Sequence, residues 1–218
     1  LIVESGQLNT KALTTVTMNG SNQRLSSPSF DFRTTALSYT IALWIKPTDV
    51  SGFERLAFQD QRIKLDKNDD DIRFTPNYDS EFTASTVLTA GSWHHIICTF
   101  NDSDNAVAIY VDGVSEATGT DSSTNTTGAN AFFFGTKDDL DDDYTGSMRD
   151  IRMYDYALSA DQAASLYRGS YNVTPEYAWK LDEGTGNASG WGTGNAGVAI
   201  DLTHNAGWAE GSLKVNGA

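Results

Sequence analysis

Residues 39–45 read Tyr39-Thr40-Ile41-Ala42-Leu43-Trp44-Ile45, and this stretch decides the fold class. Successive side chains of an extended strand point to opposite sides, so odd-numbered and even-numbered residues here would face different ways. Both sets are largely apolar, which is typical of a central strand buried on both faces. We therefore expect Trp44 to be buried between two sheets, as we expect for Trp93 in a similar pattern over residues 93–100.

Alternating patterns of strand length recur along the chain, separated by turns rich in Gly, Asn and Asp. Asp112-Gly113 marks a tight hairpin turn. The alternation over residues 149–154 places Arg149 and Ile151 on one face of a strand, and Arg152 on the opposite face. Many short strands at this spacing predict an all-β sandwich. The other expected strands cover residues 15–18, 56–58, 62–65, 72–75, 82–87, 106–111, 131–134, 198–202 and 212–215.

One short helix is expected near residues 159–168. Ser159 is a good N-cap residue, and Gln162, three residues later, completes a capping box with it. Leu166 and Tyr167 belong to an apolar stripe, and Gly169 marks the C-terminal stop. A helix of about two turns caps a sandwich rather than building a helical domain.

The composition excludes several classes of function. The 218 residues include 15 Lys and Arg against 29 Asp and Glu, a formal net charge of −14. Such a chain would repel a phosphate backbone, so we expect neither nucleic acid nor an anionic membrane as a partner. A single Cys excludes an intrachain disulfide, and no apolar run is long enough to span a membrane. The start at Leu1 has neither a basic stretch nor a long apolar one, so we expect no signal peptide, and because the first residue is not Met we expect a processed chain or a fragment.

Several motifs together resemble one known family. Ser92-Trp93-His94-His95-Ile96 followed by Ile109-Tyr110-Val111-Asp112-Gly113 resembles the central hairpin of laminin-G-like domains. Phe134-Gly135, an acidic loop and the stretch Gly146 to Tyr154 resemble the closing segment of the same family. The match covers residues 13–170, after an N-terminal extension over residues 1–12. This resemblance, to the concanavalin A-like group that includes the pentraxins, implies a two-sheet antiparallel jelly-roll sandwich.

The C-terminal segment, residues 171–218, is rich in Gly and resembles the opening of such a domain a second time. Ala178-Trp179-Lys180-Leu181-Asp182 looks like a domain start, and Gly211 to Gly217 repeats the pattern of Thr14 to Gly20. Two accounts stay open. The segment is either the stub of a tandem second domain, or it supplies opening strands to this domain or to a neighbouring copy. In the second account Trp179 and Leu181 pack onto residues 13–170, and the segment docks beside residues 150–154.

Catalytic motifs are weak in this sequence. Glycosidases of the wider group bring two carboxylates to the sugar from one strand, but no two glutamates here are close enough to form that strand. His94 and His95 are adjacent on a strand and point to opposite faces, so they do not readily bind one metal. We expect His95 to be a packed, hydrogen-bonded side chain and Cys98 a small buried one. The sequence therefore predicts that the protein is not an enzyme.

The acidic loop Asp138-Asp139-Leu140-Asp141-Asp142-Asp143 is the strongest chemical signal. Five neighbouring carboxylates repel each other unless they are solvated or neutralised, and a hard cation neutralises them well. The matching loop of pentraxins carries calcium ligands, which implies calcium as a cofactor here. We take Asp138, Asp139, Asp141 and Asp143 as candidate ligands, with a solvated loop tip as the alternative.

Aromatic residues in expected loops supply candidate ligand-binding positions, because an exposed ring stacks well on a sugar. These residues are Tyr78, Tyr144, Trp191 and Trp208. The favoured function is non-catalytic recognition of a glycan or another surface ligand outside a cell or on a particle surface. The alternative is a structural subunit of a bacteriophage particle or surface filament, a decoration, fibre or appendage protein. Expected partners are a glycan or surface protein and, through the C-terminal segment, copies of the chain itself, with no membrane insertion.

Overall fold

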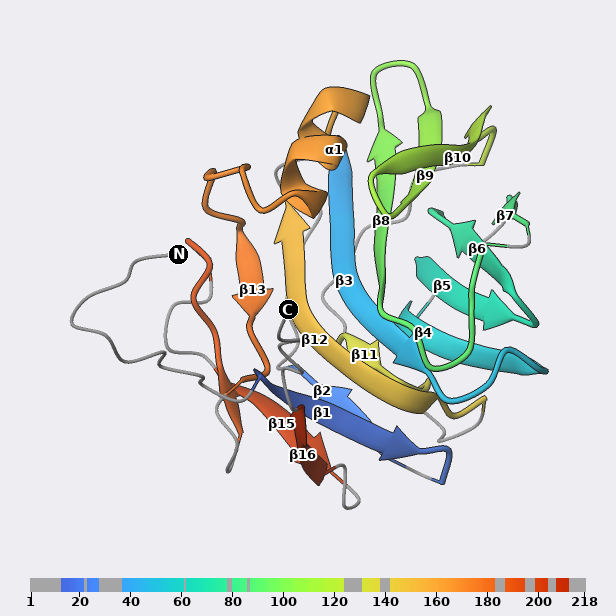
Figure 1. Cartoon of the computed structure of the whole chain (residues 1–218). Helices are drawn as coiled ribbons and strands as arrows, with labels where there is room; N and C mark the ends of the chain where they lie inside the picture. The colour runs from blue at the N-terminus through green and yellow to red at the C-terminus, as the bar shows by residue number, and fades with distance from the viewer. Residues whose placement is uncertain are drawn as a thin grey trace, which may run out of the picture.

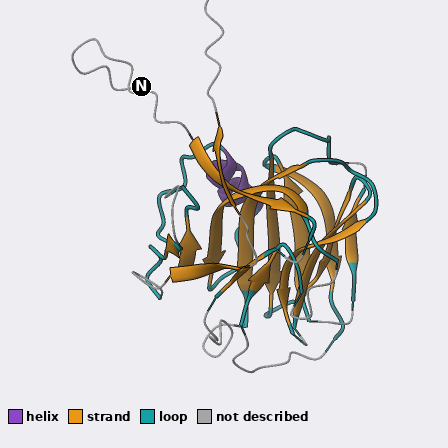
Figure 2. Ribbon diagram, turned by 90° about the horizontal axis from the view of Figure 1, so that it is seen from below, coloured by secondary structure: helices purple, strands orange, loops and turns teal. Residues whose placement is uncertain are grey.

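The fold was established from a computed structural model of the chain. It describes residues 13–21, 23–27, 37–60, 62–77, 80–85, 87–123, 131–137, 142–182, 187–194, 199–203 and 207–211. Its strands form two antiparallel sheets that pack face to face, with one short helix at the periphery (Figures 1 and 2). The predicted two-sheet sandwich is confirmed.

The first sheet has the order β10-β9-β8-β3-β12-β1-β16, and β13 also pairs with β12. Its long central strands β3 and β12 curve strongly and carry most of the residues discussed below (Figure 1). The strands of this sheet are β1 (Leu13–Asn19), β3 (Tyr39–Pro47), β8 (His94–Asn101), β9 (Ala106–Val111), β10 (Val114–Thr120), β12 (Thr145–Tyr154), β13 (Tyr177–Trp179) and β16 (Gly207–Gly211).

The second sheet has the order β14-β15-β2-β11-β4-β5-β6-β7. Asp69, with a φ of 53°, turns the chain between β5 and β6. The strands of this sheet are β2 (Arg24–Ser26), β4 (Phe53–Gln59), β5 (Ile63–Asn68), β6 (Asp71–Thr75), β7 (Phe82–Ala84), β11 (Phe133–Phe134), β14 (Ala188–Ser189) and β15 (Ala199–Thr203).

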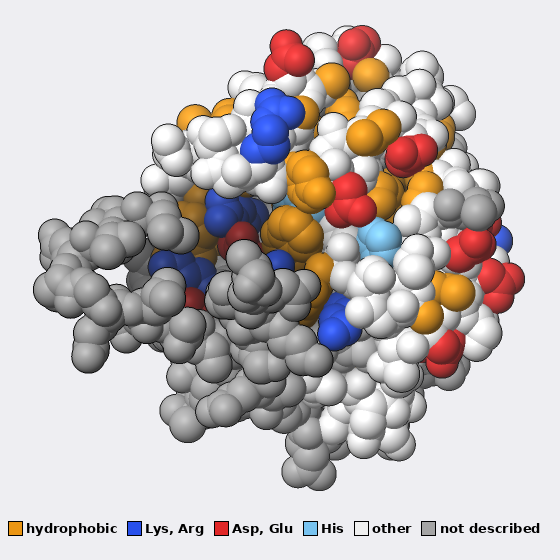
Figure 3. All heavy atoms as spheres, viewed as in Figure 1, with side chains coloured by type: hydrophobic (Ala, Val, Ile, Leu, Met, Phe, Trp, Pro, Cys, Tyr) orange, Lys and Arg blue, Asp and Glu red, His pale blue; other side chains and the backbone are white. Residues whose placement is uncertain are grey.

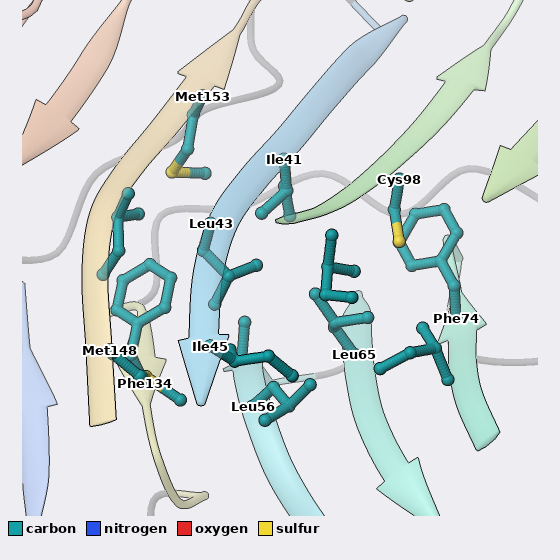
Figure 4. Close-up of a cluster of buried hydrophobic side chains, with 14 of the residues drawn as sticks. Ile41, Leu43, Ile45, Leu56, Leu65, Phe74, Cys98, Phe134, Met148 and Met153 are labelled. Carbon is teal, nitrogen blue, oxygen red and sulfur yellow. The ribbon is translucent and has the colours of Figure 1, made fainter. Parts of the chain in front are cut away.

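The main core fills the space between the two sheets. Ile41, Leu43 and Ile45 of β3 point toward Leu65 of β5 and Phe74 of β6, as the close-up in Figure 4 shows. Cys98 is fully buried in the same cluster, as predicted, and burial raises the pKa of its thiol. The odd-numbered side of the 39–45 stretch therefore forms the core, because those side chains are the ones that face the second sheet.

The even-numbered side of β3 faces away from the second sheet. Ala42 of β3 and Ile97 of β8 lie there in a smaller apolar cluster with Ala163 and Leu166 of α1 (Ala160–Tyr167). Both bonds of the predicted capping box are present: Ser159 accepts from the Gln162 amide N–H, and the Gln162 side chain accepts from the Ser159 N–H. Within the described residues, no helix has the length and apolar character needed to cross a membrane.

The expectation that Trp44 and Trp93 are buried between the sheets is wrong. Both are only partly buried and lie on the face of the first sheet that points away from the second. Leu43 and Ile45, the chain neighbours of Trp44, occupy the core side, and the strict alternation of a strand turns Trp44 outward. The sequence showed that both sides of β3 were apolar, but it did not show that the second sheet covers one side and a smaller cluster around a short helix lies on the other.

The C-terminal segment folds back onto the domain. Tyr177, Ala178 and Trp179 pair with Met153, Arg152 and Ile151 of β12, at the edge where docking was predicted. Trp179 and Leu181 are both fully buried, which confirms that this segment packs onto residues 13–170. Further along, β16 pairs with β1 and β15 pairs with β2, so both opening strands have partners from the C-terminal segment. The strand expected over 212–215 lies outside the described residues.

Candidate functional site

The outer face of the first sheet carries a cluster of aromatic and basic side chains, which we call the aromatic–basic face. Basic and hydrophobic side chains lie together on this side of the molecule, below the helix (Figure 3). Its residues come from β3, β8, β12, the end of α1 and the C-terminal segment, so distant parts of the chain meet there. The face comprises Trp44, Trp93, His95, Arg149, Asp150, Arg152, Tyr167, Lys180 and Trp191.

A β-bulge in β12 brings both arginines to this face. The pairing register between β12 and β3 shifts between Arg149 and Arg152, and Asp150 has a φ of 51°. Asp tolerates this left-handed conformation better than most residues, and the extra residue changes which side chains share a face. The Asp150 N–H donates to the carbonyl of Lys180 at 2.8 Å, which ties the bulge to the C-terminal segment. The predicted alternation, with Arg149 and Arg152 on opposite faces, is therefore wrong.

Three rings stack where β3, β8 and α1 meet. Trp44 lies directly opposite His95 in the strand pairing, and their rings stack with centroids 4.7 Å apart. The Tyr167 ring lies 5.8 Å from Trp44 and 6.2 Å from His95. Gly113 gives it room, since a Cβ there would lie 2.9 Å from the Tyr167 ring, and its φ of +80° suits glycine. Tyr167 remains 38% exposed, so part of its ring is open to a ligand.

Arg149 extends this stack toward Trp93. Its guanidinium carbon lies 5.0 Å from the centre of the Trp44 ring and 4.4 Å from that of Trp93. Both distances are in the range of a cation–π interaction. The two indoles thus help to position the guanidinium on the sheet.

The second half of the face contains an ion pair and another indole. Arg152 donates from Nε and Nη2 to the two carboxylate oxygens of Asp150, both at 2.8 Å. The Arg152 guanidinium lies 5.1 Å from the Trp191 ring centre, and the ammonium of Lys180 lies 5.8 Å from it. Trp191 is partly buried, and its Nε1 has no hydrogen-bond partner in the described part of the chain. This half therefore offers donors, acceptors and an aromatic ring side by side.

His95 is the most deeply buried ionisable group of the face, with 2% of its surface exposed. Burial lowers its pKa to about 3, and the nearby Arg152 and Arg149 lower it further in the same direction. The ring is therefore neutral at pH 7, and its Nδ1 finds no hydrogen-bond partner within the residues that the structure describes. The expectation of a packed histidine is confirmed, but the expected hydrogen bond is missing at that nitrogen. His94 points the other way: its Nδ1 lies 2.9 Å from Asp112 Oδ2 and its Nε2 accepts from the Thr89 N–H.

A hollow separate from the aromatic–basic face lies on the same sheet, where the N-terminal end of α1 approaches β8, β9 and β10. Its volume is about 520 Å³, and its lining is rich in hydroxyl groups and small side chains. Tyr110 is the ionisable group in the lining, and burial raises its pKa. The hollow has no charged side chain in its lining, so it offers less to a polar ligand than the aromatic–basic face.

Comparison with known proteins places the chain in a family. Residues 19–164 match the laminin G type model described as the concanavalin A-like lectin/glucanases superfamily. The chain belongs to this superfamily. The family resemblance expected from the hairpin and closing motifs is thereby confirmed. No curated protein matches the sequence significantly.

Several solved structures share the fold of this chain at low sequence identity. A candidate carbohydrate-binding protein from Bacteroides ovatus is 14% identical with a TM-score of 0.67, covering 93% of this chain and 61% of its own. A heptameric SAP-like pentraxin from Limulus polyphemus is 15% identical with a TM-score of 0.60, covering 92% and 99%. A sialidase module, CBM40, from Ruminococcus gnavus, solved bound to α2,3-sialyllactose, is 12% identical with a TM-score of 0.54, covering 71% and 98%. The chain thus spans 61% of the length of the Bacteroides protein.

Of the four predicted calcium ligands, only Asp143 lies within the described residues. Asp138, Asp139 and Asp141 lie outside the described residues, and Asp143 is partly buried. The neighbouring Asp142 carboxylate lies 3.7 Å from Arg55 and 3.6 Å from Lys137, so basic side chains neutralise part of this loop. Within the described residues, no three His, Cys, Asp or Glu side chains come together in a metal-binding arrangement. Calcium binding stays a prediction.

The four predicted aromatic positions have different outcomes. Trp191 lies on the aromatic–basic face, whereas Tyr78 lies outside the described residues. For Trp208 the structure describes the backbone, paired with Val16 of β1, but not the side chain. The expected exposure of Tyr144 is wrong: it is fully buried in the core, and burial raises the pKa of its hydroxyl well above the usual value. Tyr144 therefore presents no ring to a sugar.

Sequence reasoning missed most of the face. Trp44, Trp93 and Tyr167 were treated as core or helix residues, and Arg149 and Arg152 were placed apart. One signal was available: two arginines and an aspartate lie among the apolar residues Met148, Ile151, Met153 and Tyr154. Polar residues at such positions indicate that one side of the strand is not simply core. The bulge that unites them leaves no clear mark in the sequence.

Proposed function

We propose that this chain is a non-catalytic glycan-recognition module and that the aromatic–basic face is its binding surface. The observation that carries the proposal is the grouping of partly exposed Trp and Tyr rings with Arg and Asp on a rigid sheet face. Sugars present C–H faces that pack on aromatic rings and hydroxyl groups that bond to charged side chains. Membership of a superfamily of lectins and glucanases, and neighbours described as carbohydrate-binding, support the same proposal.

The charge arrangement favours binding over catalysis. Glycoside hydrolysis in most families needs two carboxyl groups, one on each side of the scissile bond. On the aromatic–basic face, the two carboxylate oxygens of Asp150 accept hydrogen bonds from Nε and Nη2 of Arg152. Asp112, nearby, accepts from the His95 N–H and lies 2.9 Å from His94 Nδ1. Both carboxylates are already committed to side chains of the protein, which supports a binding role.

Screening on a glycan array tests this function. We expect binding to a defined set of glycans and at least tenfold weaker binding by Tyr167→Ala, because a stacking ring is lost. Phe53→Ala is the matched control, since Phe53 is also 38% exposed but lies on β4 of the other sheet. The proposal fails if no glycan binds, or if the two variants bind as well as each other.

Calcium dependence is a separate part of the proposal and rests on the charge density of residues 138–143. A cation that binds only the folded state raises the melting temperature by mass action. We expect calcium to raise the melting temperature relative to chelator, and replacement of Asp139 and Asp141 by Asn to remove the difference. Equal melting temperatures of the unmodified protein in the two buffers would rule calcium out. A location at a cell or virion surface is likewise proposed and follows from the binding role.

A further inference from the structure

We propose that the glycan bound by the aromatic–basic face carries a negative charge, as a carboxylate or a sulfate ester, and that Arg149 recognises this group. The inference rests on the proposed function, since it names the class of ligand for the same face. Three observations support it: the contacts of Arg149 with two indole rings, the pairing of the neighbouring Asp150 with Arg152, and two buried polar atoms of His95 and Trp191.

Arg149 is a partly buried cation. Among the described residues, no carboxylate lies within 4.0 Å of its guanidinium. The nearest candidate, Asp150, gives both of its oxygens to Arg152. Burial accordingly lowers the pKa of Arg149, although the guanidinium stays charged at pH 7. A desolvated charge of this kind is unfavourable unless a partner arrives, and an anionic ligand supplies one.

Two other buried basic residues, unlike Arg149, are paired with carboxylates. Arg55 is paired with Asp66 at 2.6 Å, and the ammonium of Lys67 lies 3.5 Å from Glu54. Lys67 also donates to the backbone carbonyls of Ser51 and Gly52. In a chain with a net charge of −14 there are acids in excess, yet the carboxylate of Asp150, the chain neighbour of Arg149, is paired with Arg152 instead.

The position of Arg149 also suits a ligand. Trp44 and Trp93 both lie within cation–π distance of the guanidinium, a planar group that makes a two-point contact with carboxylate or sulfate. Lys180, which is exposed, brings a further positive charge beside Trp191. Lys46, two residues along β3 from Trp44, adds another on the same side of the strand.

Two polar atoms of the face support an incoming polar ligand. His95 Nδ1 and Trp191 Nε1 are both buried, and neither has a hydrogen-bond partner among the described residues. Buried polar atoms are nearly always bonded, so each such atom calls for an explanation. A sugar hydroxyl accepts from the Trp191 N–H, and it donates to or accepts from a neutral imidazole nitrogen. The aromatic–basic face thus offers a charged anchor and neutral polar contacts for one ligand.

Paired glycans that differ only in charge test the inference. We would titrate the full chain with 3′-sialyllactose, lactose and lactose sulfated on the galactose, following tryptophan fluorescence, and then screen an array of matched acidic and neutral glycans. The variants are Arg149→Met, which keeps the length and removes the charge, and Arg149→Lys, which keeps the charge and loses the two-point contact. Arg73→Met is the matched control, because Arg73 is also partly exposed and lies on β6 of the other sheet. Thermal melts establish that each variant is folded.

We expect the acidic member of at least one pair to bind and its neutral partner to bind at least tenfold more weakly. Arg149→Met should weaken acidic binding roughly ten- to a hundredfold, Arg149→Lys less, and Arg73→Met should have no effect. The arms with carboxylate and sulfate show which of the two anions is recognised. Equal binding of acidic and neutral glycans would overturn this inference and leave the proposed function intact. Acidic binding that survives Arg149→Met would overturn it as well, and no binding to any glycan would overturn both.

Discussion

His95 is held neutral by its surroundings, and this makes the stability of the fold depend on pH. Its pKa of about 3 in the folded protein, caused first by burial and then by Arg152 and Arg149, lies below the ordinary value of 6.5. Between pH 6.5 and pH 3 the His95 imidazole is protonated in the unfolded chain but not in the folded chain. The stability associated with this group is therefore complete above pH 6.5 and is lost as the pH falls toward 3.

We expect the free energy of unfolding to fall by about 2–3 kcal/mol between pH 6 and pH 4 from this group alone, given about 1.4 kcal/mol per unit. His95→Phe keeps an aromatic ring in the stack with Trp44 and removes the titration, so it should remove this part of the pH dependence. Urea unfolding of both proteins at pH 6, 5 and 4 measures the difference. Parallel pH profiles for the two proteins would show that His95 is not held neutral.

At the level of elements, the two sides of the first sheet predict different effects of the same substitution. Trp179 of β13 is fully buried, and its ring lies 6.3 Å from Phe134 in the core. Trp93, just before β8, is partly exposed on the outer face. Trp179→Ala should lower the free energy of unfolding by about 3–5 kcal/mol, the usual range for a buried aromatic, and Trp93→Ala by clearly less. Chemical denaturation of the two variants measures both values, and a larger loss at Trp93 would contradict the assigned faces.

The sequence predicted the elements well where a pattern stays regular over several residues. The alternation of residues 39–45 and of residues 106–111 corresponds to β3 and β9, and the capping box at Ser159 marks the start of α1. It failed where backbone geometry breaks the pattern, because the bulge at Asp150 adds one residue and reverses the predicted face of Arg149. It also missed β10 and β2, because a polar edge strand and a three-residue strand carry little apolar signal.

The candidate site was harder to predict than the fold, for a physical reason. The aromatic–basic face joins residues from β3, β12, α1 and the C-terminal segment, and only the folded sheet brings them together. Single-residue reasoning selected aromatics in loops, which found Trp191 but also Tyr144, a core residue. The environment of a ring, rather than its place in a loop, decides whether it is open to a sugar.

At the scale of the whole molecule, the C-terminal segment completes both sheets. Strands β13 and β16 extend the first sheet beside β12 and β1, and β15 covers β2 in the second. Removing residues 178–218 would expose these edges and the core beneath Trp179. We expect the truncated chain to be largely unfolded or aggregated, as measured by circular dichroism and light scattering. A truncated chain as stable as the full one would show that the segment is only the stub of a second domain. The molecular mass of the full chain in solution shows whether two copies exchange their C-terminal segments.

The most direct test of the central claim is to follow the five tryptophan indole N–H signals by NMR while an array-selected glycan is added. Trp44, Trp93 and Trp191 lie on the aromatic–basic face, whereas Trp179 is fully buried in the core and serves as an internal reference. We predict that the signals of Trp44, Trp93 and Trp191 shift with the added glycan and that the signal of Trp179 stays in place. Binding that leaves those three signals unchanged would contradict the assignment of this face as the glycan-binding surface.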